Sequence, residues 1–519
     1  MTTPLFNWLR ERSVGILAHV SSLPSPYGIG NFGKGAHDFV DFLSDAGMRL
    51  WQVCPLGPTG YGDSPYQSFS AFALNPYFID LEKLIDFNAI TAEDLAPLRA
   101  LPQERVDYGA LYATFWPILE KAANKFLNNP QRGDLHLIWK TFLEENHAWV
   151  EPYCAFMALK ARFKGQSWTQ WPAEFRNYQK AQQSPLFAEI VKAGEKYAVY
   201  QCIAFSQWRD LREYAGNKGV QVIGDIPIFV ASDSADVWSN PELFDLTAEG
   251  LPASQAGVPP DYFSQDGQLW GNPLYNWKAH AKSKYAWWLS RLKTNLDLYD
   301  IVRLDHFRGF ESYWSVPPEE KTARTGKWIP GPGIELFASI AKAFPDCKLI
   351  AEDLGDLTPG VHDLLMATGL PGMSILQFAF GGDEKNVYLP HHALHNQVLY
   401  PGTHDNNTAR GWYETTSEAT RLHAQRYLGI NGSEISWDLV RAAYRNIACI
   451  AIIPLQDLLN LGSEGRMNTP STAQGNWSWR ISPQALQQLH NESTRYLHDL
   501  GALYGRLSPR PRPNTRANS

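Results

Sequence analysis

The sequence is poor in cysteine and has no long apolar run. Only five of its 519 residues are cysteines, and they are widely spaced, with no CxxC pair. This excludes a disulfide scaffold and the common zinc motifs, and it is typical of buried thiols in a reducing compartment. No apolar run is long enough to span a membrane, and no apolar segment follows a basic start at the amino terminus, so neither a membrane helix nor a secretory signal is predicted. We therefore expect a cytoplasmic protein.

The chain also has no excess of positive charge. The net charge is −7, and no basic stripe interleaved with aromatic residues is present, which argues against a nucleic-acid partner. Aromatic residues, by contrast, make up 13% of the chain, which is more than a core alone requires. Because sugar rings have apolar faces that stack on aromatic rings, this composition favours a carbohydrate ligand, although most of the aromatic side chains are expected to pack in the interior.

Four apolar, strand-like segments end in an acidic residue, at Asp225, Asp305, Glu352 and Asp405. Segments long enough for helices, such as residues 333–344, lie between them. This alternation predicts a (β/α)8 TIM barrel, whose active site is built at the carboxyl ends of the strands. A single acid near an arginine is more often part of a structural ion pair than a catalytic group, but the repetition at four strand ends favours an active site.

The rest of the chain can be divided around this barrel. Residues 1–85 are expected to hold the first strands and a substrate loop, and residues 216–506 the remainder of the barrel. The helical pattern of residues 86–215 is too long for one barrel helix, so it predicts a mostly helical insertion. Residues 231–277 form a long aromatic loop that we interpret as a lid, and residues 507–519 are expected to be a disordered tail. The strand candidates are residues 13–20, 50–56, 220–227, 301–304, 347–351, 373–378, 398–400 and 448–454.

Two of the acids suit the cleavage of a glycosidic bond. Retaining enzymes use one carboxylate as nucleophile and one carboxylic acid as proton donor, about 5 to 5.5 Å apart. Asp305 follows Arg303 by two residues and shares its face of the strand, so we expect a lowered pKa and an ionised nucleophile. Glu352 lies next to Asp353, so we expect a raised pKa and a general acid.

Three neighbouring polar residues suit the binding of sugar hydroxyls. Asp405, with His404 before it, is placed to hydrogen-bond two hydroxyls and distort the sugar ring rather than to transfer protons. His306, which directly follows Asp305, is expected to be a second hydroxyl ligand.

Metal and nucleotide sites are the alternatives to weigh. No HExxH motif and no EF-hand series occurs, so we expect no metal. The glycines of residues 28–33 lack the strand-to-helix context of a GxGxxG motif, and we expect no cofactor. The residues that raise the metal alternative are Asp353, Asp356, Asp405, His391, His392, His395 and His404.

Short motifs along nearly the whole chain resemble the amylomaltase family, whose members are 4-α-glucanotransferases, also named disproportionating enzymes. Each motif alone is weak evidence, but the whole set in this order is specific for the family. Residues 455–459 and 476–480 also resemble the family's carboxy-terminal part. The motifs are residues 60–67, 224–227, 259–263, 303–308, 351–355 and 402–406.

The resemblance implies a barrel with subdomains inserted in its βα loops and no separate C-terminal β-domain. It implies that Asp305 is the nucleophile, Glu352 the general acid and base, and Asp405 the carboxylate that stabilises the transition state. It also implies a lid over the acceptor subsites at residues 259–264, and a remote glucan-binding region at Tyr61. The expected substrate-binding residues are Tyr61, Asp63, Ser64, Tyr66, Asp225, Pro259, Asp261, Tyr262, Phe263, Trp270, Arg303, His306, His404 and Asn406.

The expected reaction is the transfer of an α-1,4-glucan segment from a donor maltooligosaccharide or amylose to the 4-hydroxyl of an acceptor glucan or glucose, by a retaining double displacement. Two alternatives stay open: an α-glucan hydrolase of the same chemistry and a non-catalytic glucan-binding barrel. An aromatic lid that excludes water and stacks on the acceptor favours transfer. The expected partners are α-1,4-glucans of starch and glycogen metabolism, and the protein is expected to be a monomer or a weak homodimer.

Overall fold

The structure is a computed structural model that describes residues 3–60, 62–129, 133–260, 264–355, 357–472 and 474–507. In this part of the chain, eight parallel strands form one sheet. The two ends of the sheet meet where Ala351 N donates to Pro371 O at 2.9 Å, so the strands close into a barrel in chain order. The predicted (β/α)8 barrel is therefore confirmed. Its strands are β1 (Ser13–Leu17), β2 (Leu50–Gln52), β3 (Gln221–Ile226), β6 (Ile301–Leu304), β9 (Leu349–Ala351), β10 (Gly372–Ile375), β11 (Gln397–Tyr400) and β12 (Ile450–Pro454).

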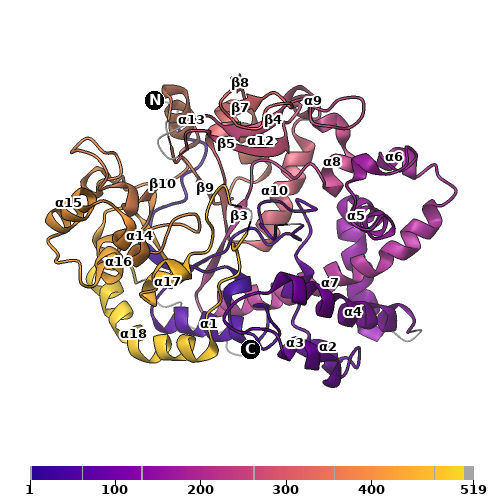
Figure 1. The fold of residues 1–519 in the computed structure, drawn as a ribbon, viewed down its shortest axis with the longest axis horizontal. Helices are drawn as coiled ribbons and strands as arrows, with labels where there is room; N and C mark the ends of the chain where they lie inside the picture. Colours follow the sequence, from indigo (N-terminus) through magenta and orange to yellow (C-terminus); the bar gives the residue numbers. More distant parts are fainter. Residues whose placement is uncertain are drawn as a thin grey trace, which may run out of the picture.

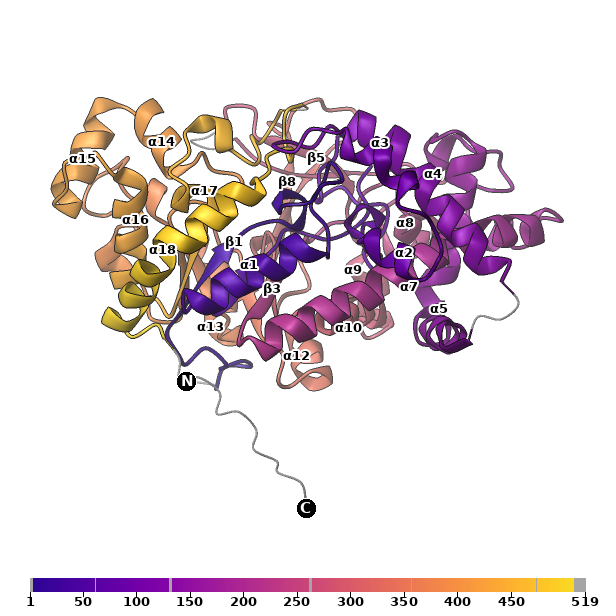
Figure 2. The same ribbon diagram turned by 90° about the horizontal axis from the view of Figure 1, so that it is seen from below.

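Helices cover the barrel on the outside (Figures 1 and 2). Figure 2 shows α1 and α18 lying side by side across the barrel wall. The helices around the barrel are α1 (Lys34–Asp45), α9 (Trp277–Lys282), α10 (Ala286–Leu298), α11 (Arg308–Glu311), α12 (Gly333–Ala343), α13 (Pro359–Thr368), α14 (Ala409–Thr415), α15 (Glu418–Leu428), α16 (Ile435–Arg445), α17 (Leu455–Leu458) and α18 (Pro483–Leu503). Short 3-10 turns are Val20–Ser22, Pro76–Phe78, Glu93–Leu95, Trp168–Gln170, Pro241–Leu243, Leu376–Phe378, Pro390–His392 and Ser463–Gly465.

The barrel interior is filled by every second residue of the strands, as the two-residue period of a strand requires. Gly15 is needed here, because a Cβ at this position would lie 2.2 Å from the carbonyl oxygen of Leu50. The same alternation continues from Ile301 to Arg303 and Asp305, and it carries polar side chains to the barrel mouth. The interior apolar residues include Leu17, Leu50, Ile223, Ile301, Ile350, Met373, Ile375, Val398, Tyr400, Ile450 and Ile452.

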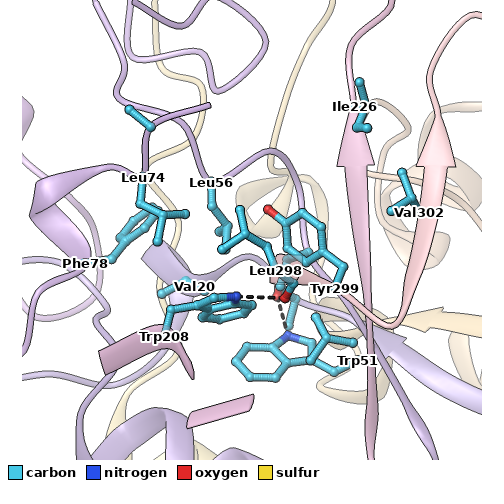
Figure 3. Packing of buried hydrophobic residues seen from close by; sticks show 14 of the residues in the cluster. Val20, Trp51, Leu56, Leu74, Phe78, Trp208, Ile226, Leu298, Tyr299 and Val302 are labelled. Carbon is cyan, nitrogen blue, oxygen red and sulfur yellow. Dashed lines mark hydrogen bonds between the residues drawn. The ribbon is translucent and has the colours of Figure 1, made fainter. Parts of the chain in front are cut away.

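A second layer of core lies between the strands and the helices (Figure 3). Trp51 of β2 and Trp208 of α7 (Phe187–Asn217) are both fully buried, with ring centroids 6.2 Å apart. Trp208 Nε1 donates to Leu298 O at 2.9 Å, and its ring lies edge-on to Tyr299. These contacts fix the longest helix between β2 and β3 directly against the barrel wall.

Long helices occupy the part of the chain between β2 and β3, on one side of the barrel in Figure 1. The same side carries α8 (Ala235–Ser239), which follows β3. The helices between β2 and β3 are α2 (Glu82–Asp86), α3 (Ala96–Arg99), α4 (Tyr108–Leu127), α5 (Gly133–Arg162), α6 (Tyr178–Ala181) and α7.

The segment interpreted as a long loop, residues 231–277, holds regular structure. It contains two strands, β4 (Gln255–Val258) and β5 (Gln268–Pro273), which pair antiparallel. Together with β7 (Ser312–Val316) and β8 (Lys327–Pro330) they form a second sheet in the order β5-β4-β7-β8. The sequence did not predict this sheet, because its strands are short and interrupted by glycine, and because half of it comes from beyond β6.

A buried arginine connects the first and last strands of the barrel at their amino-terminal ends. The guanidinium of Arg506 is fully buried and donates to the carbonyl oxygens of Ser13, the first residue of β1, and Cys449, just before β12, at 2.9 Å each. It also donates to carbonyl oxygens of residues 443, 444, 446 and 448. Of the expected tail, only Leu507 lies among the described residues. Within those residues, no helix is both long and apolar enough to cross a membrane.

Candidate active site

Strand register places the acids side by side at the barrel mouth. β3 and β6 pair so that Asp225 lies opposite Arg303, and β6 and β9 pair so that Leu304 lies opposite Ala351. Asp305 and Glu352 directly follow the last pair. The backbone N–H of Glu352 donates to Leu304 O at 3.0 Å, which extends the ladder to the two acids. The structure therefore brings together the two residues expected to act as nucleophile and general acid.

Arg303 links two carboxylates in a buried network. Its Nη1 lies 2.8 and 2.7 Å from the two carboxylate oxygens of Asp225 and 2.9 Å from Oδ1 of Asp305. The hydroxyl of Tyr66 donates to Asp225 Oδ2 at 2.7 Å, and burial raises the pKa of Tyr66 well above its usual value. Tyr66 thus stays protonated and adds a second donor to Asp225 beside Arg303.

The pKa of Asp305 is raised to about 7, not lowered as the sequence suggested. Burial is the largest cause; Arg303 lowers the pKa, whereas Asp225 and Glu352 raise it. The expectation was wrong because the Asp305 side chain is only 26% exposed, so little water stabilises its charge. In addition, one nitrogen of Arg303 serves two carboxylates at once.

Glu352 is held by backbone donors. Its Oε2 accepts from the N–H of His306 at 2.6 Å and its Oε1 from the N–H of Leu354 at 3.0 Å. Burial raises the pKa of Glu352 more than Arg303 and these donors lower it, and Asp353 adds to the rise. The raised pKa expected for Glu352 is confirmed. Asp353 itself turns toward β10, where its Oδ1 accepts from the N–H of Met373 at 2.6 Å.

His306 has a constrained backbone and an available ring nitrogen. Its φ is 50°, in the left-handed region that non-glycine residues rarely adopt. Nε2 is buried and bonds to no group among the described residues, so its capacity for a hydrogen bond is unused. The Trp270 ring lies edge-on at 4.9 Å. Burial lowers the pKa of His306 to about 4, and Arg308 contributes, so the imidazole is neutral.

Asp405 lies beyond the end of β11 and is held by a segment that follows β12. Asn468 Nδ2 donates to its Oδ1 at 2.6 Å, and Arg466 Nη2 donates to its backbone oxygen at 2.7 Å. His404 Nε2 lies 3.4 Å from Asp405 Oδ2. The His404 ring stacks on Tyr66 at 5.2 Å, so the third acid is connected to the network around Asp225.

Other expected binding residues have structural contacts. The Oδ1 of Asn406 accepts from the N–H and hydroxyl of Thr403, which makes it a turn-forming residue. Ser64 Oγ accepts from the N–H of Tyr66 at 3.3 Å. Asp63 has φ 57° in the same loop, and burial raises its pKa to about 6. Pro259 directly follows β4 and is half-buried. Tyr61, Asp261, Tyr262 and Phe263 lie outside the described residues.

The residues that raised the metal alternative are dispersed. His395 contacts Cys449, and His391 contacts the hydroxyl of Tyr427. Among the residues that the structure describes, no three His, Cys, Asp or Glu side chains are grouped to hold a metal ion. Asp356 lies outside these residues.

Sequence reasoning missed Arg466, Asn468 and the ring of Trp477, which lies 5.7 Å from His404. These residues belong to an irregular segment after β12, whereas the search for site residues followed the ends of strands. The aromatic motif at residues 476–480 was the available signal, but it carried no indication of the polar pair ten residues earlier.

Known proteins match this sequence over nearly the whole chain. Residues 18–487 match the family model described as 4-alpha-glucanotransferase. The 4-alpha-glucanotransferase of Clostridium butyricum is 45% identical over 493 residues, covering 94% of this chain and 99% of that protein. The protein of the same name from Thermus thermophilus is 45% identical over 492 residues, covering 93% and 97%.

A solved structure agrees with this result. The amylomaltase of Streptococcus agalactiae in complex with acarbose has a TM-score of 0.90 to this structure at 38% identity, covering 96% of this chain and 100% of that one. The fold, the arrangement of acids at the barrel mouth and these matches lead to one conclusion: the chain belongs to the 4-alpha-glucanotransferase family.

Proposed function

We propose that the protein transfers α-1,4-glucan segments from a donor maltooligosaccharide or amylose to the 4-hydroxyl of an acceptor glucan or glucose, with retention at the anomeric carbon. The observation that carries this proposal is the adjacent placement of Asp305 and Glu352 at paired strand ends within one buried charge network. Asp305 is the nucleophile, Glu352 the general acid and base, and Asp405 the third carboxylate.

In the first step, a carboxylate oxygen of Asp305 attacks the anomeric carbon of the donor and the glycosidic C–O bond breaks. The proton of Glu352 passes to the departing 4-oxygen, and a glycosyl ester on Asp305 is formed. In the second step, Glu352 takes the proton from the 4-hydroxyl of the acceptor. The acceptor oxygen then attacks the anomeric carbon, and the bond to Asp305 breaks. Two inversions give net retention.

The contacts of the two acids support this division of roles. Arg303 lies 2.9 Å from Asp305 and stabilises its ionised form. The raised pKa of Glu352 favours the protonated form that a general acid needs at the start of the reaction. Since the two groups lie in one pocket, ionisation of one disfavours ionisation of the other, so the pair can share a single proton.

The remaining groups bind the sugar. Asp405 and His306 Nε2 suit the hydroxyls of the ring that reacts, and hydrogen bonds to these hydroxyls strengthen in the transition state. Trp270, next to His306, suits stacking on the acceptor ring, which excludes water from the glycosyl ester. As part of the same function, we propose that residues 259–264 act as a lid over the acceptor subsites.

Incubation with maltotriose tests the reaction. Transfer yields free glucose together with longer oligomers while the number of reducing ends stays constant. A steady growth of reducing ends would instead identify an α-glucan hydrolase, and an absence of any products would identify a non-catalytic glucan-binding barrel.

We also propose that the enzyme works in the cytoplasm, on glucans of starch and glycogen metabolism, as a monomer or weak homodimer. The support for the location is that all five cysteines are free thiols, as in proteins of reducing compartments. Fractionation of the host cells and size-exclusion chromatography at several protein concentrations test these two points.

A further inference from the structure

The segment that follows β12 makes a closed set of hydrogen bonds around Asp405. Asn468 donates through Nδ2 to Asp405 Oδ1 at 2.6 Å and through its backbone N–H to His404 O at 3.1 Å. Arg466 donates through Nη2 to Asp405 O at 2.7 Å and through Nε to Asn468 O at 2.8 Å. Two residues of one segment thus hold both the backbone and one carboxylate oxygen of the third acid.

Asn468 is itself held in place by the segment's own structure. The backbone N–H of Trp477 donates to Met467 O at 2.8 Å, which closes the chain into a loop with Asn468 at its base. Trp477 is 2% exposed and has φ 60°, a backbone conformation that costs energy for a bulky residue and clusters at functional sites. Its ring packs beside Tyr66 and His404, so the base of the loop is anchored to the active site.

We propose that Asn468 is a positioning residue for Asp405. The proposal rests on the function proposed above. The Asp405 side chain is 48% exposed, so burial alone does not fix its orientation. The amide of Asn468 holds Oδ1 of Asp405 and so fixes the rotation of the carboxylate. The same rotation sets the direction of Oδ2, which lies beside His404. Arg466 supports this arrangement by fixing the backbone oxygen of Asp405 rather than by pairing with its carboxylate.

The expected effect is on the transition state more than on substrate binding. Hydrogen bonds from a third carboxylate to the sugar hydroxyls strengthen as the ring distorts, and an interaction that is stronger in the transition state raises kcat rather than lowering KM. A wrongly turned Asp405 should therefore reduce kcat while KM changes little.

Several titratable groups surround this pair and contribute to any pH dependence. His404 and Arg466 contact Asp405 directly, and Asp405 influences the pKa of Cys54 and of Arg466. The further groups around His404 are His19, Tyr66 and Asp305, with Arg303, Asp225 and Glu352 next to Asp305.

The variant Asn468→Asp tests the proposal through pH. It keeps the size of the side chain but replaces the N–H donor with a carboxyl. Near neutral pH the two adjacent carboxylates repel and Asp405 turns away or takes a proton, so we expect kcat for maltotriose to fall by about a hundredfold. When the new carboxyl is protonated, it again donates to Asp405. The ratio of variant to wild-type kcat should therefore rise at least about fivefold as the pH is lowered from about 7 to 5.

Two further variants complete the test. Asn468→Ala cannot donate at any pH, so its kcat should fall by about tenfold with KM within about threefold of wild type and no pH-dependent recovery. Asn396→Asp makes the same chemical change before β11, at the opposite end of the strand, where the Asn396 side chain is exposed and donates to Gly369 O. We expect this control to keep wild-type kinetics.

The outcomes separate the two proposals. If wild-type protein produces no transfer from maltotriose, the proposed function fails. If wild type transfers but folded Asn468→Asp has wild-type kcat, or a loss that does not vary with pH, the role of Asn468 is refuted. If Asn468→Asp does not fold, Asn468→Ala decides alone: a change confined to KM refutes the role, and a fall confined to kcat supports it.

Discussion

Arg303 contacts both carboxylate oxygens of Asp225, at 2.7 and 2.8 Å, and only one oxygen of Asp305, at 2.9 Å. The guanidinium therefore makes more contacts with the buried Asp225 than with Asp305, the proposed nucleophile. This sharing limits how strongly Arg303 stabilises the ionised form of Asp305, and it makes Asp225 a determinant of the pKa of Asp305.

Replacing Asp225 with asparagine should lower the pKa of Asp305, because the charge of Asp225 raises it. Asp305 then stays ionised at lower pH, and the acid limb of the kcat/KM profile should move to lower pH. We also expect the maximal rate to fall and the free energy of unfolding to drop by about 3 kcal/mol, since a buried pair is broken. The profile is measured with maltotriose, and stability by urea unfolding.

Asp300→Asn is the matched control for this experiment. It makes the same change just before β6, where Asp300 pairs with Arg212 at 2.8 Å, away from the barrel mouth. An acid limb that moves equally in both variants, or in neither, would contradict the coupling of Asp225 to Asp305.

Asp305→Asn should abolish transfer by several orders of magnitude and yet stabilise the protein at neutral pH. In the folded state the pKa of Asp305 is about 7, whereas in the unfolded chain it is about 3.9. Between these values the unfolded state releases a proton that the folded state keeps, so wild-type stability declines as the pH rises from about 4 to 7. The variant does not titrate, and we expect a gain of about 2 to 4 kcal/mol at pH 7 that disappears near pH 4.

Urea unfolding of both proteins at the two pH values measures this difference, and a binding assay with maltooligosaccharides shows that the site is intact. A variant that is less stable than wild type at pH 7 would refute the raised pKa. Full transfer activity in the variant would refute the assignment of the nucleophile.

Glu352→Gln should slow transfer from maltotriose by about a thousandfold, because the leaving oxygen is no longer protonated. A donor with a fluoride leaving group, such as α-maltosyl fluoride, needs no proton at this step. The variant should therefore release the first equivalent of fluoride, before the second step limits turnover, at a rate much closer to that of wild type. Equal impairment with both donors would argue that Glu352 acts on structure rather than as an acid.

Trp270→Ala should raise the ratio of hydrolysis to transfer by about tenfold. The Trp270 ring lies edge-on to His306, and its loss opens the acceptor side of the site to water. Reducing ends and free glucose are counted in the same reaction with maltotriose. Trp328→Ala, on the opposite edge of the same antiparallel sheet, is the control and should leave the ratio unchanged. The same ratio in wild type and Trp270→Ala would contradict a role for this ring in acceptor capture.

The barrel could be predicted from the sequence because its strands are apolar and evenly separated by helices. Each expected strand overlaps one of the observed barrel strands, from Val14 and its neighbours to Ile452. The acids could also be located, since Asp305 and Glu352 directly follow apolar runs. Parallel register then brings strand ends to one rim, whatever the length of the inserted segments.

Electrostatics and irregular segments could not be predicted in the same way. The pKa of Asp305 depends on Asp225, which is 80 residues earlier in the chain, and on how one nitrogen is divided between two acids. Asn468 reaches Asp405 across 63 residues, from a segment without periodic pattern. Asn406 carries the residue type of a sugar ligand, but its side chain is used by the turn at Thr403.

Arg506 gives the chain a late step in its assembly. Its guanidinium joins the carbonyl oxygens of Ser13 and Cys449, so the start of the first strand and the entry to the last are tied by a residue that leaves the ribosome after both. During synthesis this connection between β1 and the start of β12 can form only after residue 506 has emerged. The acids of the site are thus translated well before the arginine that joins the first and last strands of their scaffold.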